Sequence, residues 1–341
     1  MHARGPSARE PQTWRARAAL DRRWHKRPSA EQDAPARIAR QWLDMTTPTA
    51  QGPAAEAGTI LLGGDLPVNR MGFGAMRITG KGTWGPPADH DEAIRVLRRA
   101  VELGVDFIDT ANSYGPYVSE ELIADALHPY PEGLVIATKG GFERPGPGQW
   151  EMNGRPDHLR TELDGSLKRL KLDRIDLYQL HRIDPKVPAD EQFGVLAEFQ
   201  REGKVRHVGL SEVSMQDIDA ARRVVPIVSV QNRYNVNDRE WESVVEYCTR
   251  EAMAFIPWSP LAAGRLRDAR GPLDEVAQRR GVTPLTVAIA WLLARSPWML
   301  VIPGTSSVPH EDENVAAAGM ALSAEDLALL DTAAEPGRKA H

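Results

Sequence analysis

Short apolar segments recur along this chain at intervals that leave room for one helix between each pair. Eight such segments, rich in aliphatic and β-branched residues, follow one another: 71–76, 105–109, 134–138, 175–180, 205–210, 227–231, 254–258 and 299–303. Stretches with apolar residues at three-and-four spacing lie between them, for example 92–103, 159–170 and 190–203. Eight strand–helix repeats over about 260 residues predict a closed α/β fold, a (β/α)8 TIM barrel.

An open, doubly wound parallel sheet is the alternative that the same pattern allows. When such a fold binds a dinucleotide, a GxGxxG motif usually follows its first strand. Here MGFGAMR leads into a loop, and no later acidic partner can be placed. The barrel is therefore favoured, and a chain of 341 residues accommodates one barrel with extensions.

Local signals refine the boundaries of these elements. TILLGGDLPVNR, from Thr59, predicts a β-hairpin turning at Gly-Gly-Asp, which we expect to close the bottom of the barrel. Thr283 before Pro284 predicts a helix start, and Ser323 with Asp326 predicts a second one through a capping box.

Residues 1–57 are predicted to be a flexible basic and polar extension, followed by the barrel over 58–335 and a tail over 336–341. Residues 1–44 hold ten Arg or Lys against five acids and few aliphatic residues, too little apolar surface to offset the entropy of ordering. A transit peptide is the alternative, although the acids fit it poorly. Translation starting at Met45 is a further hypothesis.

Composition excludes several classes of function. A formal charge of -5 with 26% charged residues offers no basic surface for nucleic acid. The apolar segments are too short to span a membrane, and the single cysteine, Cys248, allows neither an internal disulfide nor a thiolate zinc site. We expect a soluble, cytoplasmic protein without a metal, and the oligomeric state stays open.

Four polar residues stand where predicted strands end. Asp109 ends 105–109 and Tyr114 follows in the next loop, while Lys139 and His181 directly follow 134–138 and 175–180. Each alone is more often a loop cap, a packing residue or a solvated side chain. Because the carboxyl ends of barrel strands share one rim, their joint placement points to catalysis.

The reduction of a carbonyl explains this set of side chains. Hydride arriving at carbon leaves charge on oxygen, so a proton donor is needed there. Tyr114 is a poor acid alone, but the ammonium of Lys139 favours its phenolate, and Asp109 would hold that lysine in place. His181 can hydrogen-bond the substrate oxygen and orient it.

The sequence resembles the aldo-keto reductase family. The likeness lies in GVDFIDTANSYG (104–115), ATKGG (137–141), LYQLHRID (177–184), KVRHVGLSEVS (204–214), VQNRYN (230–235), IPWSPLAAGRL (256–266) and IPGTSS (302–307), in family order from about Thr59 to Asp331. The resemblance implies a (β/α)8 fold, an NAD(P)(H) cofactor and the catalytic tetrad Asp109, Tyr114, Lys139 and His181.

The resemblance also assigns the cofactor contacts. Ser211 and Gln231 would bind the nicotinamide carboxamide, and Trp258 would stack on the ring. The remaining contacts, along the ring, the pyrophosphate, the adenosine phosphate and the adenine, would come from Met76, Arg77, Asp109, Ser259, Pro260, Leu261, Gly264, Gly304, Thr305, Ser306, Glu313 and Asn314.

Three positions depart from the family pattern. Glu212 stands beside Ser211 where many members have Asn, which puts its contact with the carboxamide in doubt. Gly304 and His310 stand where a lysine and an arginine often bind the 2′-phosphate. Neutral histidine holds phosphate less firmly than a guanidinium. The resemblance still favours NADP(H) over NAD(H), with NAD(H) left open.

The substrate would be a small carbonyl compound. Trp84 and Trp150 lie on predicted rim loops and could wall its pocket beside Tyr114 and His181, or could only pin those loops. Two other functions compete: a cofactor-binding interaction subunit of the same fold with little turnover, and a metal-dependent barrel hydrolase. The predicted strand ends offer no histidine or carboxylate cluster with metal-ligand spacing, which argues against the hydrolase.

Overall fold

The computed structural model describes residues 51–268 and 270–333. The extension before Gln51, the hypothetical start at Met45 and the tail 336–341 lie outside these residues. Pro53–Ala57 form the 3-10 helix η1, whose Ala54 and Ala57 are buried, and Ala54 N donates to Leu103 O at 3.0 Å. Residues 53–57, which the sequence placed in the flexible extension, therefore form a helix that is partly buried.

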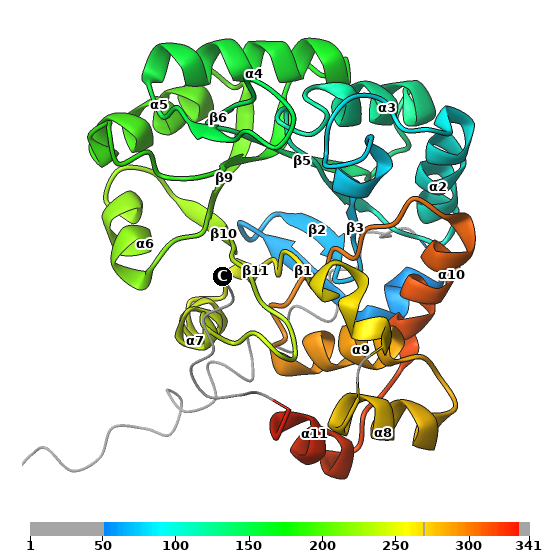
Figure 1. Cartoon of the computed structure of the whole chain (residues 1–341). Coiled ribbons are helices and arrows are strands. Elements are labelled where there is room, and N and C mark those ends of the chain that lie inside the picture. The colour runs from blue at the N-terminus through cyan, green and yellow to red at the C-terminus, as the bar shows by residue number, and fades with distance from the viewer. Residues whose placement is uncertain (1–50, 269, 334–341) are drawn as a thin grey trace, which may run out of the picture. The chain divides into compact units, whose positions relative to one another are not determined.

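Seven parallel strands form one curled sheet, drawn in Figure 1. Along the chain they are β3 (Phe73–Gly74), β4 (Phe107–Asp109), β5 (Val135–Gly140), β8 (Ile175–Leu180), β9 (Val205–Ser211), β10 (Ile227–Gln231) and β11 (Ala254–Phe255). Each strand pairs with the next in sequence order, as the βα repeats predict.

The eighth predicted strand, 299–303, closes the barrel. Met299 forms a parallel bridge to Phe255 of β11, and Val301 forms one to Met71 just before β3. Leu300 N donates to Phe255 O at 2.9 Å, and Val301 N donates to Arg70 O at 2.9 Å. The pairing consists of isolated bridges because the segment ends at Pro303, which has no N–H to extend a ladder. The predicted (β/α)8 barrel is confirmed.

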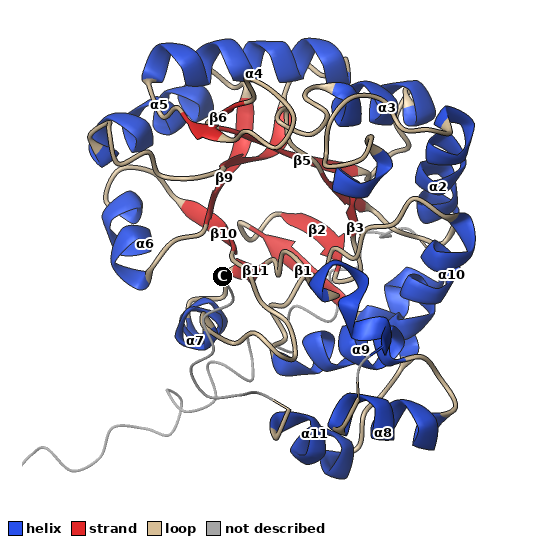
Figure 2. Ribbon diagram, viewed as in Figure 1, coloured by secondary structure: helices blue, strands red, loops and turns tan. Residues whose placement is uncertain are grey.

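Helices surround the strands (Figure 2). They are α2 (His90–Glu102), α3 (Val118–Leu127), α4 (Pro156–Leu170), α5 (Ala189–Arg201), α6 (Met215–Arg222), α7 (Glu242–Arg250), α8 (Pro272–Arg280), α9 (Pro284–Arg295), α10 (Val308–Ala316) and α11 (Ala324–Asp331). Thr283 caps α9, and Ser323 with Asp326 forms the capping box of α11, as predicted. In the part of the chain that the structure describes, no helix is long and apolar enough to cross a membrane.

The predicted hairpin is also confirmed. Strands β1 (Thr59–Leu62) and β2 (Leu66–Asn69) pair antiparallel. Their apolar side chains form one buried cluster with residues from the barrel strands: Ile60, Leu62, Leu66 and Val68 with Phe107, Val135, Leu177, Ala254 and Leu300. Because Phe107, Val135 and Ala254 each begin a strand, the hairpin closes the amino-terminal end of the barrel and leaves the carboxyl end for the site.

Short elements shape that carboxyl end. The 3-10 helices η2 (Ala75–Ile78) and η3 (Ala262–Asp268) follow β3 and β11, and a small antiparallel pair, β6 (Phe142–Glu143) and β7 (Glu151–Met152), follows β5. A fourth 3-10 helix, η4 (Ala317–Gly319), joins α10 to the segment before α11.

Candidate active site

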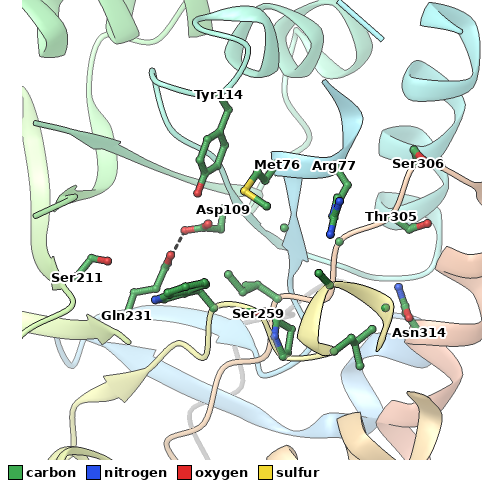
Figure 3. Close-up of a pocket in the computed structure, with 18 of the residues that line it drawn as sticks. Met76, Arg77, Asp109, Tyr114, Ser211, Gln231, Ser259, Thr305, Ser306 and Asn314 are labelled. Carbon is green, nitrogen blue, oxygen red and sulfur yellow. Dashed lines mark hydrogen bonds between the residues drawn. The ribbon is translucent and has the colours of Figure 1, made fainter. Parts of the chain in front are cut away.

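A pocket of about 690 Å³ opens at the carboxyl ends of the strands. Eighteen residues predicted from the sequence line it: Met76, Arg77, Asp109, Tyr114, Trp150, His181, Ser211, Gln231, Trp258, Ser259, Pro260, Leu261, Gly264, Gly304, Thr305, Ser306, His310 and Asn314. Figure 3 shows Tyr114 and Asp109 on one side of this space and Thr305, Ser306 and Asn314 on the other. A pocket of this volume is within the range of small-molecule and cofactor sites.

A buried ion pair forms the floor of the pocket. Lys139 Nζ lies 2.6 Å from Asp109 Oδ2, donates to Thr110 O at 2.8 Å, and lies 3.4 Å from Tyr114 Oη. Lys139 is fully buried and does not itself line the pocket. Tyr114, which does line it, is in contact with the lysine ammonium. The strand ends thus bring three of the four predicted catalytic residues into direct contact.

Two glutamines complete the shell around Asp109. Its Oδ1 accepts from Gln231 Nε2 at 2.8 Å, drawn as a dashed line in Figure 3, and from Gln179 Nε2 at 3.1 Å. Gln179 is fully buried on β8. With Lys139 on Oδ2, both oxygens of this buried carboxyl group have partners, as buried polar groups require.

Electrostatics at Tyr114 and Lys139 follow from burial and from their contact. Burial raises the pKa of Tyr114 above its ordinary value, and the Lys139 ammonium opposes that rise without cancelling it. Burial lowers the pKa of Lys139, but Asp109 and Tyr114 outweigh it, so that its net pKa is raised. The phenol is therefore protonated and the lysine charged at neutral pH.

His181 lines the pocket beside Tyr114. Its ring centroid is 5.9 Å from that of Tyr114 and 4.8 Å from that of Phe142, and its Nδ1 is 3.4 Å from Ser113 Oγ. Burial, with the charges of Lys139 and two arginines, lowers its pKa well below the ordinary value. The imidazole is neutral at pH 7 and can donate one hydrogen bond into the pocket.

Glu212 is one of the predicted cofactor contacts, although the sequence leaves its contact with the carboxamide in doubt. It does not line the pocket. Its Oε1 accepts from the indole Nε1 of Trp258 at 2.6 Å and from the backbone N of Arg233 at 2.7 Å. Its carboxylate thus lies behind Trp258 rather than against the space that Trp258 faces.

The segment after β11 turns tightly over the pocket. Ser259, Ala262, Ala263 and Gly264 all have positive φ, at 57°, 49°, 59° and 85°. Only the last favours this conformation, so three residues with side chains are held in the left-handed region. Such local strain is common where a backbone is shaped around a ligand.

The other end of the pocket follows the closing segment 299–303. Gly304, Thr305, Ser306 and His310 line it there, together with Asn314 of α10. Glu313, predicted to bind adenine beside Asn314, does not line the pocket. Its carboxylate accepts a hydrogen bond from Thr283 Oγ1 at the start of α9.

The two candidate substrate tryptophans occupy different environments. Trp150 lines the pocket, with 37% of its surface exposed, and contacts the ring of Phe142 at 5.4 Å. Trp84 lies outside the lining. The guanidinium of Arg144 lies 3.6 Å from the ring centroid of Trp150 and 5.4 Å from that of Trp84, so Trp84 packs behind Arg144 at the rim.

Seven lining residues were not predicted: Gly74, Phe142, Arg182, Ala263, Arg267, Leu285 and Ile302. Phe142 and Arg182 stand within two residues of the ends of β5 and β8, so the strand-end rule could have found them. Arg267 lies at the end of η3 and Leu285 in the first turn of α9. Neither position carries a sequence signal for the pocket.

Enzymes of many families share a barrel with a pocket at its carboxyl rim, so the fold alone does not assign this chain to one of them. Residues 70–335 match the model of the aldo/keto reductase family. The chain belongs to this family.

Three similar proteins illustrate the relationship. The chain is 51% identical to an uncharacterized oxidoreductase of Schizosaccharomyces pombe, over 85% of this chain and 94% of that protein. It is 42% identical to the pyridoxine 4-dehydrogenase of Escherichia coli, over 79% of this chain and 96% of that one. A solved aldo-keto reductase from Klebsiella pneumoniae in complex with NADPH superposes with a TM-score of 0.70 at 27% identity, covering 83% and 97% of the two chains.

Proposed function

We propose that this protein reduces aldehydes or ketones to alcohols with NADPH, using Tyr114 as the proton donor. The observation that supports this proposal is the contact of one buried ammonium, Lys139 Nζ, with both Asp109 and Tyr114 Oη. Few functions other than proton transfer require a phenol at the edge of a pocket to touch a buried charge.

Each side chain has a part in the reaction. Bound nicotinamide would supply the hydride to the carbonyl carbon. Tyr114 Oη donates its proton to the carbonyl oxygen, and Lys139 stabilises the phenolate that remains. Asp109 holds Lys139 charged and in place, and neutral His181 donates a hydrogen bond that orients the carbonyl.

The residues that line the pocket fit an extended dinucleotide. Ser211, Gln231 and Trp258 would take the nicotinamide end beside Tyr114, while Thr305, Ser306 and Asn314 would take the adenosine end. The Ser259–Gly264 turn, with its glycine in the left-handed region, suits close approach of backbone N–H groups to the pyrophosphate.

Arg267 supports NADPH over NADH. Arg267 lines the pocket, and its guanidinium forms no ion pair with any described residue, whereas Gly304 and His310 leave the usual positions without a fixed charge. A guanidinium can hold a phosphate through two hydrogen bonds. The Klebsiella pneumoniae relative solved with NADPH supports the proposal that this chain binds the same cofactor.

The 42% identity to a pyridoxine 4-dehydrogenase makes pyridoxine and its 4-aldehyde the first natural pair to assay. The proposal for the reaction itself does not depend on that pair, because an activated aldehyde such as 4-nitrobenzaldehyde tests the chemistry directly.

The deciding experiment follows NADPH oxidation by the wild type, Tyr114→Phe and Tyr117→Phe. Loss of a general acid is expected to lower kcat by about 10²- to 10⁴-fold in Tyr114→Phe. Tyr117, 48% exposed outside the pocket lining, is the matched control and should keep the wild-type rate. Equal rates for Tyr114→Phe and wild type would refute the mechanism, and tight NADPH binding without turnover would favour an interaction subunit.

A further inference from the structure

Arg182 brings an unused cation into the reacting end of the pocket. It follows His181 directly and lines the pocket. Its Nη1 donates to His181 O at 2.6 Å and to Ser211 Oγ at 2.9 Å. Nε and Nη2 donate to no acceptor among the described residues, which leaves three of the five guanidinium protons for another partner.

Arg182 also has no counter-ion in direct contact among the described residues. No carboxylate in residues 51–268 or 270–333 forms an ion pair with it. Glu212 is the acid that acts on it electrostatically, but the Glu212 oxygen Oε1 is already bonded to Trp258 and to Arg233 N. A largely buried guanidinium without a counter-ion is costly unless a ligand supplies one.

The surroundings indicate where such a ligand group would lie. Arg182 contacts Ser211, assigned to the nicotinamide end, and its charge acts on both Tyr114 and His181. Its guanidinium also lies 5.8 Å from the ring centroid of Phe142, on the apolar wall shared with Trp150. An anion held by Arg182 must therefore stand close to the carbonyl carbon, not at the far end of a long substrate.

We propose that Arg182 binds an anionic oxygen next to the substrate carbonyl, so that the preferred substrates are 2-oxo acids and aldehydes carrying an ionised oxygen beside the carbonyl. This inference rests on the proposed reductase function and deepens it by naming a substrate class. Nε and Nη2 form a two-pronged donor that matches a carboxylate. The apolar wall of Phe142 and Trp150 accommodates the rest of an aromatic substrate.

Arg182 has one competing role, the positioning of the Ser211 hydroxyl. A residue that only positioned Ser211 would affect cofactor binding and would slow all substrates alike. A residue that binds the anion discriminates between a charged substrate and its uncharged analogue. The two roles therefore differ in a ratio of rates, which a change in overall stability or cofactor affinity does not move.

The test compares phenylglyoxylate with its methyl ester, which differ in charge beside the same ketone. kcat/KM is measured for both at saturating NADPH in wild type, Arg182→Gln and Arg182→Lys. Arg155→Gln, which removes an exposed arginine outside the pocket lining, is the matched control for a general field effect. Thermal melting of each variant reports on folding.

We expect Arg182→Gln to lower the acid-to-ester ratio of kcat/KM by about 10- to 100-fold, the value of a hydrogen-bonded charge pair. Arg182→Lys should keep part of the preference, because it keeps the charge but not the fork. Arg155→Gln should leave the ratio unchanged. An unchanged ratio in Arg182→Gln, or wild type that reduces the ester but not the acid, overturns the proposal while the reductase function stands. If wild type reduces neither compound nor 4-nitrobenzaldehyde, the proposed function fails, and this inference fails with it.

Discussion

Glu212 accepts a hydrogen bond from the indole nitrogen of Trp258 at 2.6 Å. A carboxylate therefore fixes the ring that we assign to the nicotinamide, at a position where the sequence left the contact with the carboxamide in doubt. Because the same oxygen accepts from Arg233 N, the carboxylate also ties the end of β10 to the segment after β11.

We expect Glu212→Leu to raise the Kd for NADPH by about tenfold, the value of a hydrogen bond to a charged group. Glu212→Gln keeps a hydrogen-bond acceptor and should raise the Kd for NADPH by less. Isothermal titration of both variants, repeated in a Trp258→Phe background, measures the coupling. If Glu212→Leu has the same effect in both backgrounds, the indole is not the means by which Glu212 acts.

The ion pair of Lys139 and Asp109 should matter to folding as well as to catalysis. Both side chains are buried, so Lys139→Met leaves an unpaired carboxylate and is expected to lower the free energy of unfolding by about 3–5 kcal/mol. In urea denaturation the double variant Lys139→Met/Asp109→Asn should lose less than the sum of the single variants. Strict additivity would contradict a direct interaction.

Arg267→Ala should weaken NADPH binding by about tenfold and leave NADH binding unchanged, because only the 2′-phosphate would contact the guanidinium. Arg265→Ala, on the same helix but outside the pocket lining, is the control. Fluorescence titrations of wild type and both variants with each cofactor, at fixed ionic strength, give the six dissociation constants. An equal loss for both cofactors would assign Arg267 to the shared part of the dinucleotide.

Glu311, in the first turn of α10, predicts a pH dependence of stability. It is fully buried, neither carboxylate oxygen has a hydrogen-bond partner in the described structure, and burial raises its pKa to about 8, with the nearby Asn314 amide opposing. Between pH 4.5, where the group ionises in the unfolded chain, and pH 8, the folded state holds the extra proton. Stability therefore falls as pH rises through this window.

Glu311→Gln should remove that loss, which makes it more stable than wild type at pH 8.5 by on the order of a few kcal/mol and similar to it at pH 4.5. Glu121→Gln, at an exposed position of α3, is the control. Denaturation curves between pH 4.5 and 9 provide the comparison. Parallel pH profiles for Glu311→Gln and wild type would show that the carboxyl is ionised in the folded state throughout.

The sequence predicted the barrel, and it predicted that the candidate catalytic residues share one rim, because both follow from where the strands lie along the chain. Alternating apolar segments mark the strands, and parallel strands bring their carboxyl ends to one rim, so Asp109, Lys139 and His181 could be placed without coordinates. The side chains that lie behind the pocket could not be placed from the sequence. Glu212 and Glu313 turn to Trp258 and Thr283, partners that only the packing of loops and helices brings within reach.

The two rim tryptophans show the same limit. Trp84 and Trp150 have similar glycine-rich surroundings in the sequence, yet only Trp150 reaches the pocket. Arg144 donates to Ser113 O and Thr83 O and so joins two loops, and its guanidinium lies near both tryptophan rings. A guanidinium that joins segments distant in the chain leaves no periodic signal.

The segment 299–303, which closes the barrel, has a consequence for shortened forms of this chain. A protein truncated before Met299 would lose the residues that bridge β11 and β3, and would expose the unpaired backbone of both strands as open edges. Open edges of this kind recruit strands from other molecules. Carboxyl-terminal truncation is therefore expected to produce self-association and aggregates, rather than a smaller soluble domain.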